Sequence, residues 1–441
     1  MTTILFKDAI IVTMNPSREI LRGNLLVEDS WIKAIGTEDY SADQIIDARG
    51  QVLIPGLIQT HIHLCQTLFR GQADDLELMD WLQKRIWPLE GGHDQESLYY
   101  SAMLGIGELL RGGTTSLIDM ATVNHTESVF QAIVDSGIRA VSGKCMMDWG
   151  PEVPGTLLEG TEASLQESVK LLEKWHGQGE GRLSYAFNPR FAVSCTEELL
   201  IKVGELAKQY DVLIHTHASE NRDEIALVQR ERNMRNVAYF EHLGLAGKNL
   251  VLAHCIWLDE QELEILQRYE VKVAHCPSCN LKLGSGIAPI PEMLKRGIQV
   301  SIGADGAPCN NNLDIFTEMR TAALIQKVMH GPTVLPAQQT FELATLGGAS
   351  AMGLEEQIGS LEPGKKADLA LIDINKLHCS PGEGADIYAQ LVYQVRCSDV
   401  TLTMVDGKIL YQDGRLRSME QENIIKQCSQ ALVRVRSRAG I

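Results

Sequence analysis

The chain has 441 residues, of which 44% are hydrophobic and 22% charged, and its formal net charge is −17 at pH 7. These values are typical of a globular protein with one large and one smaller domain, and the negative charge excludes a phosphate-backbone or anionic-membrane partner. No apolar run reaches the ~20 residues of a membrane span, and the N-terminus has no signal-peptide pattern. We therefore expect a cytoplasmic protein that binds neither nucleic acid nor membrane.

Residues 1–55 are expected to form short strands. Apolar runs at 9–14, 24–29, 31–36 and 45–50 alternate with turn-forming segments such as Asn15-Pro16-Ser17. Runs of this length between turn signals favour small antiparallel sheets. We assign this segment to the N-terminal part of a β-sandwich.

From residue 56 to residue 360 the predicted secondary structure is an alternation of strands and helices. A helix at 96–111 precedes a strand at 114–119, and a capping-box pattern from Ser194 to Glu197 opens a helix to about 209, followed by a strand at 211–215. Further strands are expected at 249–254, 271–275 and 299–305. This alternation predicts a (β/α)8 barrel. The alternative is a doubly wound sheet, but no Gly-x-Gly-x-x-Gly follows a first strand.

Residues 361–441 return to strands and end in a helix. Runs at 369–373, 400–405 and 409–411 read as strands, the last two joined by a turn at Asp406-Gly407, and 419–438 reads as an amphipathic surface helix. The two strand-rich ends of the chain are expected to pair into one composite β-sandwich beside the barrel.

Five polar residues stand at or just past the ends of the apolar runs: His61, His63, His217, His254 and Asp305. The active site of a (β/α)8 barrel lies at the carboxyl ends of its strands, and strand residues two apart project to the same side. His215 could therefore face inward together with His217. We choose His217 as the functional residue because Glu220 follows it closely.

These residue types predict a metal-dependent hydrolytic site. His61, His63 and His217, with Asp305, would hold one divalent metal and leave a position for water, whose pKa the metal lowers toward neutrality. Zinc suits three nitrogens and an oxygen, and iron or manganese would also fit. Asp305 would then act as general base, Glu220 would carry a proton to a substrate ring nitrogen, and His254 would hydrogen-bond the hydroxide or the tetrahedral intermediate.

Motifs across nearly the whole chain resemble the amidohydrolase superfamily, in its branch of metal-dependent aminohydrolases of purine and triazine rings. The matching segments are 55–63, 217–220, 252–255, 275–281, 303–306 and 359–368. The resemblance implies a metal-bearing (β/α)8 barrel with a composite β-sandwich. It also implies hydrolytic deamination, in which hydroxide attacks a ring carbon that carries an amino group and ammonia leaves.

Within that branch, segments 68–82, 86–90 and 310–314 resemble deaminases of 5'-methylthioadenosine, S-adenosylhomocysteine and 5'-deoxyadenosine. The resemblance implies that Glu90 binds ribose hydroxyls. Gln66 and Arg190 depart from this subgroup, since Arg190 stands where the subgroup usually has histidine, and Gln66 is more familiar in guanine deaminases and s-triazine hydrolases. Arg190 is a donor only, so it suits a carbonyl oxygen or pairs with Glu90 or another carboxylate. Trp87 would stack on a flat heterocycle or lie in the core.

Three functional hypotheses remain open at this stage. The first is a deaminase of a 6-aminopurine nucleoside with a modified 5' position, including adenosine itself. The second is the same chemistry on guanine, 8-oxoguanine or an amino- or chloro-triazine. The third is a barrel that has lost catalysis and binds a partner. We expect a homo-oligomer, and we interpret Cys276 and Cys279 as buried thiols beside the site, because no second Cys-x-x-Cys pair follows.

Overall fold

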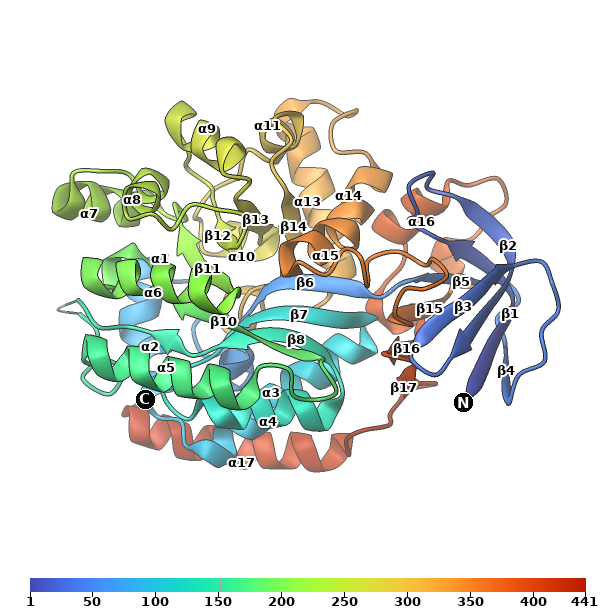
Figure 1. Cartoon of the computed structure of the whole chain (residues 1–441), viewed down its shortest axis with the longest axis horizontal. Coiled ribbons are helices and arrows are strands. Elements are labelled where there is room, and N and C mark those ends of the chain that lie inside the picture. Colours follow the sequence, from blue (N-terminus) through green and yellow to red (C-terminus); the bar gives the residue numbers. More distant parts are fainter. Residues whose placement is uncertain (151) are drawn as a thin grey trace.

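The structure, a computed structural model, describes residues 1–150 and 152–441. An eight-stranded parallel barrel lies beside a sheet that is built from both ends of the chain (Figure 1). The prediction of a (β/α)8 barrel with a composite sheet domain is therefore confirmed. The barrel strands are β6 (Leu57–Ile62), β7 (Thr114–Met120), β8 (Arg139–Gly143), β10 (Leu183–Pro189), β11 (Leu213–Ala218), β12 (Leu250–His254), β13 (Lys272–His275) and β14 (Val300–Ile302).

The barrel closes where its first and last strands meet. A bridge joins Ile62 to Asp305, and the Asp305 N–H donates to the His61 carbonyl at 2.9 Å. A side chain at Gly303 would not fit, because its Cβ would lie 2.6 Å from the backbone N and O of His61. This contact fixes the backbone of Asp305 against the strand that carries His61 and His63.

Helices cover the outside of the barrel, as the strand–helix alternation predicts (Figure 1). Side chains cap the N-termini of five of the main helices, at Asp94, Thr196, Asn221, Asp259 and Asp314. All of the main helices bury apolar residues. They are α3 (Gln95–Arg111), α4 (Thr126–Ser136), α5 (Thr161–Trp175), α6 (Glu197–Tyr210), α7 (Arg222–Arg232), α8 (Asn236–His242), α9 (Glu260–Arg268), α11 (Ile290–Lys295), α13 (Ile315–His330), α14 (Ala337–Leu343) and α15 (Leu346–Met352).

Two local predictions around β11 are wrong. Helix α6 is capped by Thr196, whose hydroxyl accepts the Leu199 N–H at 3.1 Å, whereas Ser194 lies in a preceding 3-10 turn. After α6, Asp211 takes a left-handed conformation with φ 52°. The strand therefore starts two residues later than expected and runs to Ala218. As a result His217 lies inside the strand, not beyond it.

The composite sheet has nine strands in one continuous hydrogen-bonded array. Strand β1 is bulged near its middle, so one half pairs with β4 and the other with β5, and the sheet folds around its own apolar core. The strands are β1 (Thr3–Val12), β2 (Ile20–Glu28), β3 (Trp31–Gly36), β4 (Gln44–Asp47), β5 (Gln51–Pro55), β15 (Leu369–Asp373), β16 (Val400–Val405), β17 (Lys408–Gln412) and β18 (Arg415–Leu416).

A buried ionic cluster joins this sheet to the amino-terminal end of the barrel. Arg139, at the start of β8, donates to both oxygens of Asp368 at 2.8 and 3.0 Å, and the Asp406 N–H donates to Asp368 at 2.7 Å. Lys366 pairs with Asp406 at 2.9 Å. Burial lowers the pKa of Arg139, but Asp368 and Asp406 outweigh it and the pKa is raised. The cluster is therefore charged and internally paired.

The terminal helix α17 (Gln421–Ala439) packs along α3 of the barrel and not on the composite sheet. It buries Ile424, Cys428, Ala431 and Val435 and leaves its polar face exposed. The division into residues 1–55, 56–360 and 361–441 stays a prediction. None of the described helices is long and apolar enough to cross a membrane.

Candidate metal centre and active site

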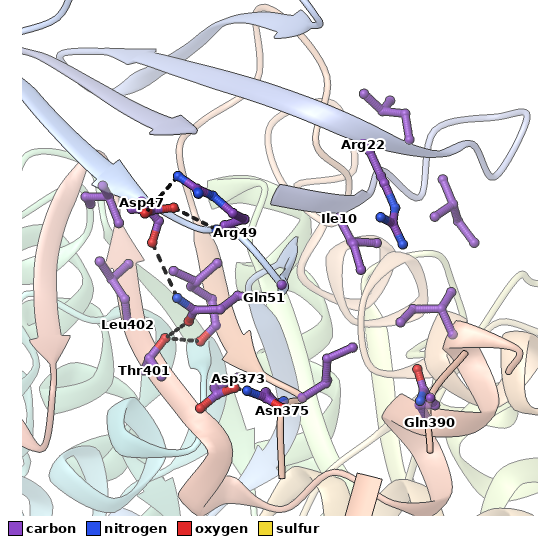
Figure 2. Close-up of a pocket in the computed structure, with 18 of the residues that line it drawn as sticks. Ile10, Arg22, Asp47, Arg49, Gln51, Asp373, Asn375, Gln390, Thr401 and Leu402 are labelled. Carbon is purple, nitrogen blue, oxygen red and sulfur yellow. Dashed lines mark hydrogen bonds and ion pairs between the residues drawn. The ribbon is translucent and has the colours of Figure 1, made fainter. Parts of the chain in front are cut away.

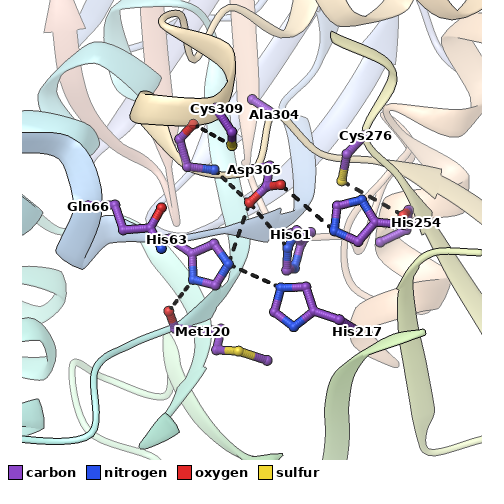
Figure 3. A network of polar contacts seen from close by, with 12 residues as sticks. His61, His63, Gln66, Met120, His217, His254, Cys276, Ala304, Asp305 and Cys309 are labelled. Carbon is purple, nitrogen blue, oxygen red and sulfur yellow. Dashed lines mark hydrogen bonds and ion pairs between the residues drawn. The ribbon is translucent and has the colours of Figure 1, made fainter. Parts of the chain in front are cut away.

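The five residues singled out in the sequence meet at the carboxyl ends of the barrel strands (Figure 3). His61 comes from β6 and His63 directly follows it, His217 comes from β11 and His254 from β12, and Asp305 follows β14. All are buried except His217, which is partly exposed. Residues almost 250 positions apart in the chain therefore converge on one point.

Two of the histidines are held by backbone carbonyls. The Nδ1 of His63 lies 2.9 Å from the Met120 carbonyl, and the Nδ1 of His217 lies 2.6 Å from the Arg190 carbonyl. A carbonyl only accepts, so each Nδ1 carries the hydrogen and each Nε2 keeps a lone pair. Both rings thus present a free ligand atom to the same place, with their Nε2 atoms 3.3 Å apart.

His61 is oriented by His215, the other histidine of β11. The Nδ1 of His61 lies 2.9 Å from the Nε2 of His215, while the Nε2 of His61 has no hydrogen-bond partner among the described residues. His215 and His217 therefore both face inward, as the spacing allowed, but they have different positions. His217 reaches the centre, and His215 supports His61 from behind.

The donor set fits one divalent metal. Ligands bound at about 2.0–2.2 Å in a tetrahedron lie about 3.3–3.6 Å apart. The Oδ1 of Asp305 is 3.4 Å from the Nε2 of His61 and 3.4 Å from the Nε2 of His63. Burial lowers the pKa of His63 to about 4, so its ring is neutral at pH 7. The orphaned nitrogen of His61 is the clearest sign that a cation belongs here.

Glu220 and His254 lie beside this centre as groups that can handle protons. The Oε2 of Glu220 is 3.5 Å from the Nε2 of His254, and Ser285 donates to its Oε1 at 3.4 Å. Burial, with the nearby charge of Asp305, raises the pKa of Glu220 to about 8, which keeps it protonated at neutral pH. Burial also raises the pKa of Asp305, but His61 and His63 outweigh it and the pKa is lowered.

The backbone around these groups is strained where they project into the site. Ser219, His254 and Asp305 all have positive φ, at 52°, 72° and 63°. Non-glycine residues adopt this conformation at a cost of about 1–3 kcal/mol, typically at functional sites. The turn before Glu220 is held because the Glu220 N–H donates to Glu224 at 2.8 Å. The side chain of Asn280 in turn holds His254, with Oδ1 2.8 Å from Nδ1.

The residues expected to bind substrate separate into two groups. Gln66 and Arg190 line the cavity above the centre, but Glu90 lies behind them. Arg190 donates to both carboxylate oxygens of Glu90, at 2.6 and 3.2 Å, and Gln66 donates to it at 2.8 Å. Glu90 thus uses most of its accepting capacity within the protein. The predicted pairing of Arg190 with a carboxylate is the arrangement observed.

Trp87 is buried outside the cavity lining, so its predicted stacking on the substrate is not supported. Trp81 lines the cavity instead, on α1 (Leu78–Trp81), together with Leu78, Leu82, Phe191 and Leu283. The cavity has a volume of about 30 Å³, which is room for about two waters. A heterocycle can bind only after these apolar residues move aside.

A much larger hollow lies elsewhere, between the composite sheet and residues 373–387 (Figure 2). It measures about 1370 Å³. Two of its polar pairs are bonded within the protein, since Thr401 donates to Gln51 at 2.8 Å and Arg49 to Asp47 at 3.3 Å. The described residues that line it include no cluster of histidines and carboxylates like that of the barrel mouth, despite its size.

Comparisons with known proteins agree with this geometry. The model of the amidohydrolase family matches residues 52–410. The chain is 40% identical over 433 residues to the 5'-deoxyadenosine deaminase of Methanobrevibacter smithii, covering 98% of this chain and 97% of that one. It is 39% identical over 428 residues to the 5-methylthioadenosine/S-adenosylhomocysteine deaminase of Syntrophomonas wolfei, covering 96% of each.

A solved structure is similar over almost the whole chain. The adenosine deaminase from Xanthomonas campestris with bound zinc superposes with a TM-score of 0.93 at 30% identity, covering 99% of both chains. The matched family is metal-dependent. The chain belongs to the amidohydrolase family and is a hydrolytic enzyme that acts on carbon–nitrogen bonds.

Proposed function

We propose that the enzyme deaminates a 6-aminopurine nucleoside with a modified 5' position, such as 5'-deoxyadenosine, 5'-methylthioadenosine or S-adenosylhomocysteine, and also adenosine. The observation that carries the proposal is one arrangement: three histidine Nε2 atoms and an Asp305 oxygen around one point, with Glu220 beside them. The names of the relatives support the choice of substrate class.

His61, His63, His217 and Asp305 would hold the metal. A divalent ion there would lower the pKa of water and supply a nucleophile near neutral pH. Three nitrogens and one oxygen suit zinc, and iron or manganese are the alternatives. The supporting contacts to Met120, Arg190 and His215 would keep the three rings in place.

Asp305 is ionised and can accept a proton, whereas Glu220 is protonated and can donate one, so the two residues would serve different proton transfers. As the water oxygen bonds to C6 of the purine, Asp305 would accept its proton and Glu220 would protonate N1. The carbon–nitrogen bond then breaks as the proton on Asp305 passes to the amino nitrogen, so that ammonia leaves. N1 keeps the proton it received, and Glu220 recovers one from the hydroxyl on C6, which becomes the ring carbonyl of the product. His254 would hydrogen-bond the oxygen that is added.

A second candidate function is favoured by the polar groups that face the cavity. The guanidinium of Arg190 is a donor there, and the Oε1 of Gln66 is buried without a partner among the described residues. A donor next to an acceptor complements a ring that carries a carbonyl beside an N–H, as in guanine or 8-oxoguanine, or the edge of a triazine. A barrel without catalysis has less support than either candidate.

A substrate panel separates the two candidates. Purified, metal-loaded enzyme is assayed for ammonia release and for loss of the adenosine absorbance maximum with 5'-deoxyadenosine, 5'-methylthioadenosine, guanine and a chlorotriazine, with chelator-treated enzyme as control. We expect the nucleosides to be turned over. Turnover of guanine or triazine without either nucleoside would refute the proposal. Substituting Glu90 is a poor discriminator, because it would leave Arg190 as a buried unpaired cation.

The remaining expectations stay part of this proposal. The substrate is a small heterocycle, no nucleic acid takes part, and the enzyme acts in the cytoplasm as a homo-oligomer. The net charge of −17 supports the absence of a nucleic-acid partner. Size-exclusion chromatography with light scattering tests the last.

A further inference from the structure

Two thiols lie directly behind the Asp305 carboxylate. Cys309 is on α12 (Ala307–Asn310), the short helix that follows Asp305 (Figure 3), and Cys279 is on α10 (Pro277–Lys282), which follows β13. A sulfur from each and an Asp305 oxygen all lie within 4.8 Å of one another. Both thiols are fully buried. The proposed reaction uses neither of them.

Cys279 also belongs to a second triad on its other side. Its sulfur, a Glu220 oxygen and a His254 nitrogen are within 4.8 Å of one another. The Nε2 of His254 is buried and has no hydrogen-bond partner among the described residues. The two triads share Cys279, so five potential ligands surround one small region beside the first centre.

Asp305 faces both regions. Its Oδ1 lies 3.4 Å from His61 and from His63, whereas its Oδ2 lies 3.8 Å from the Nε2 of His254. One carboxylate oxygen is therefore available to the first metal centre and the other to the region around Cys279. A cation near Cys279 would not need to displace a cation from the first centre. Carboxylates commonly bridge two metals in this way.

We propose that Cys279 and Cys309, with Asp305 and His254, form a second cation site that takes a thiophilic divalent ion and inhibits the enzyme. Sulfur ligands select thiophilic ions such as Cd²⁺ and Zn²⁺ over Mg²⁺. Zinc would reach this site only when it is present in excess over the first centre. Binding forms two metal–sulfur bonds and releases both thiol protons to solvent, and no oxidant or reductant is needed. Both thiols are buried and bind the ion as thiolates, because a coordinated ion displaces their protons.

Inhibition follows from the ligands that the site shares with catalysis. An ion on the Oδ2 of Asp305 and the Nε2 of His254 removes the proposed base and the hydrogen-bonding group. Its positive charge, close to Glu220, also favours the carboxylate over the protonated form that the reaction needs. The inhibition therefore depends on the proposed function, but the binding of the ion does not.

The test is a Cd²⁺ titration of zinc-loaded enzyme, followed by ultraviolet absorption, native mass spectrometry and deaminase rate. We expect one cadmium per chain in addition to the retained zinc, and a sulfur-to-cadmium charge-transfer band. The deaminase rate should fall at least tenfold, with its midpoint at the same Cd²⁺ concentration as that of the band. Mg²⁺ at equal concentration should do none of these. A wild-type enzyme that gains no band and no cadmium overturns the proposal.

Matched variants test whether the charge-transfer band comes from Cys279 and Cys309. In Cys279→Ser/Cys309→Ser the band should vanish, and Cd²⁺ should no longer inhibit relative to the same variant without it. Cys276→Ser is the control, because this neighbouring buried thiol donates to the Ala274 carbonyl and belongs to neither triad. The Cys276→Ser variant should keep both the charge-transfer band and the inhibition by Cd²⁺. If the double variant does not fold, each single variant should lose about half of the band. An unchanged band in the serine variants contradicts the site.

Discussion

The two ends of the barrel bury charged groups in opposite ways. At the amino-terminal end, Arg139, Asp368, Asp406 and Lys366 are joined by charge-assisted bonds of 2.7–3.0 Å. At the carboxyl-terminal end, His61 and His254 keep nitrogens without partners among the described residues, although both are fully buried. The first end is satisfied by the protein alone, and the second is complete only with a ligand.

The difference follows from the cost of burying polar atoms. An unpaired buried group costs about 1–3 kcal/mol, so unpaired nitrogens gathered among further ligand atoms, as at His61 and His254, indicate a bound group. The paired cluster needs nothing further and fixes the composite sheet on the barrel. The unpaired cluster includes strained backbone at His254 and Asp305. We conclude that stability is concentrated at one end and chemistry at the other.

The largest effect is expected from Glu220→Gln at the carboxyl-terminal end. Glutamine keeps the size of the side chain but cannot give up a proton, so the deamination rate should fall by about 10²–10⁴-fold. Metal content, measured in the same sample, should be unchanged because Glu220 is not among the proposed ligands. A variant that retains most of its activity would remove Glu220 from the proton route.

A smaller effect, on stability and not on activity, is expected from Arg139→Met at the amino-terminal end of the barrel. The substitution leaves Asp368 as a buried carboxylate without its cation, whereas Asp406 keeps Lys366, so the free energy of unfolding should fall by about 3–5 kcal/mol. The kcat of the folded enzyme should not change. Lys33→Met, which removes an exposed pair with Glu28 at 2.9 Å, is the matched control and should cost at most about 1 kcal/mol. Equal losses in the two variants, measured by denaturant unfolding, would contradict the comparison.

The barrel and the clustering of the proposed metal ligands could be predicted from sequence because both depend on local pattern. Apolar runs ending in His61, His63, His217, His254 or Asp305 place those residues at one edge of a parallel barrel before any contact is known. The strand–helix alternation gives the fold class for the same reason.

Features that depend on contacts between distant segments could not be predicted in this way. The support of His61 by His215 joins residues 154 positions apart. The pairing of Arg190 with Glu90, 100 positions away, was one of two roles open for Arg190, and the sequence did not decide between them. Trp81 replaces Trp87 in the cavity because the turn of helix between them decides which indole faces inward. The motif Asp80-Trp81-Leu82 was visible in the sequence, but its orientation was not.

The account depends most on a single cation held by four side chains. Anomalous diffraction at the absorption edge of the metal in natively purified crystals tests this directly. We predict one peak at about 2.0–2.2 Å from the Nε2 atoms of His61, His63 and His217 and from an Asp305 oxygen. An active enzyme with no peak at that position, or with its only peak at another cluster such as His378, Cys379 and Asp399, would contradict it.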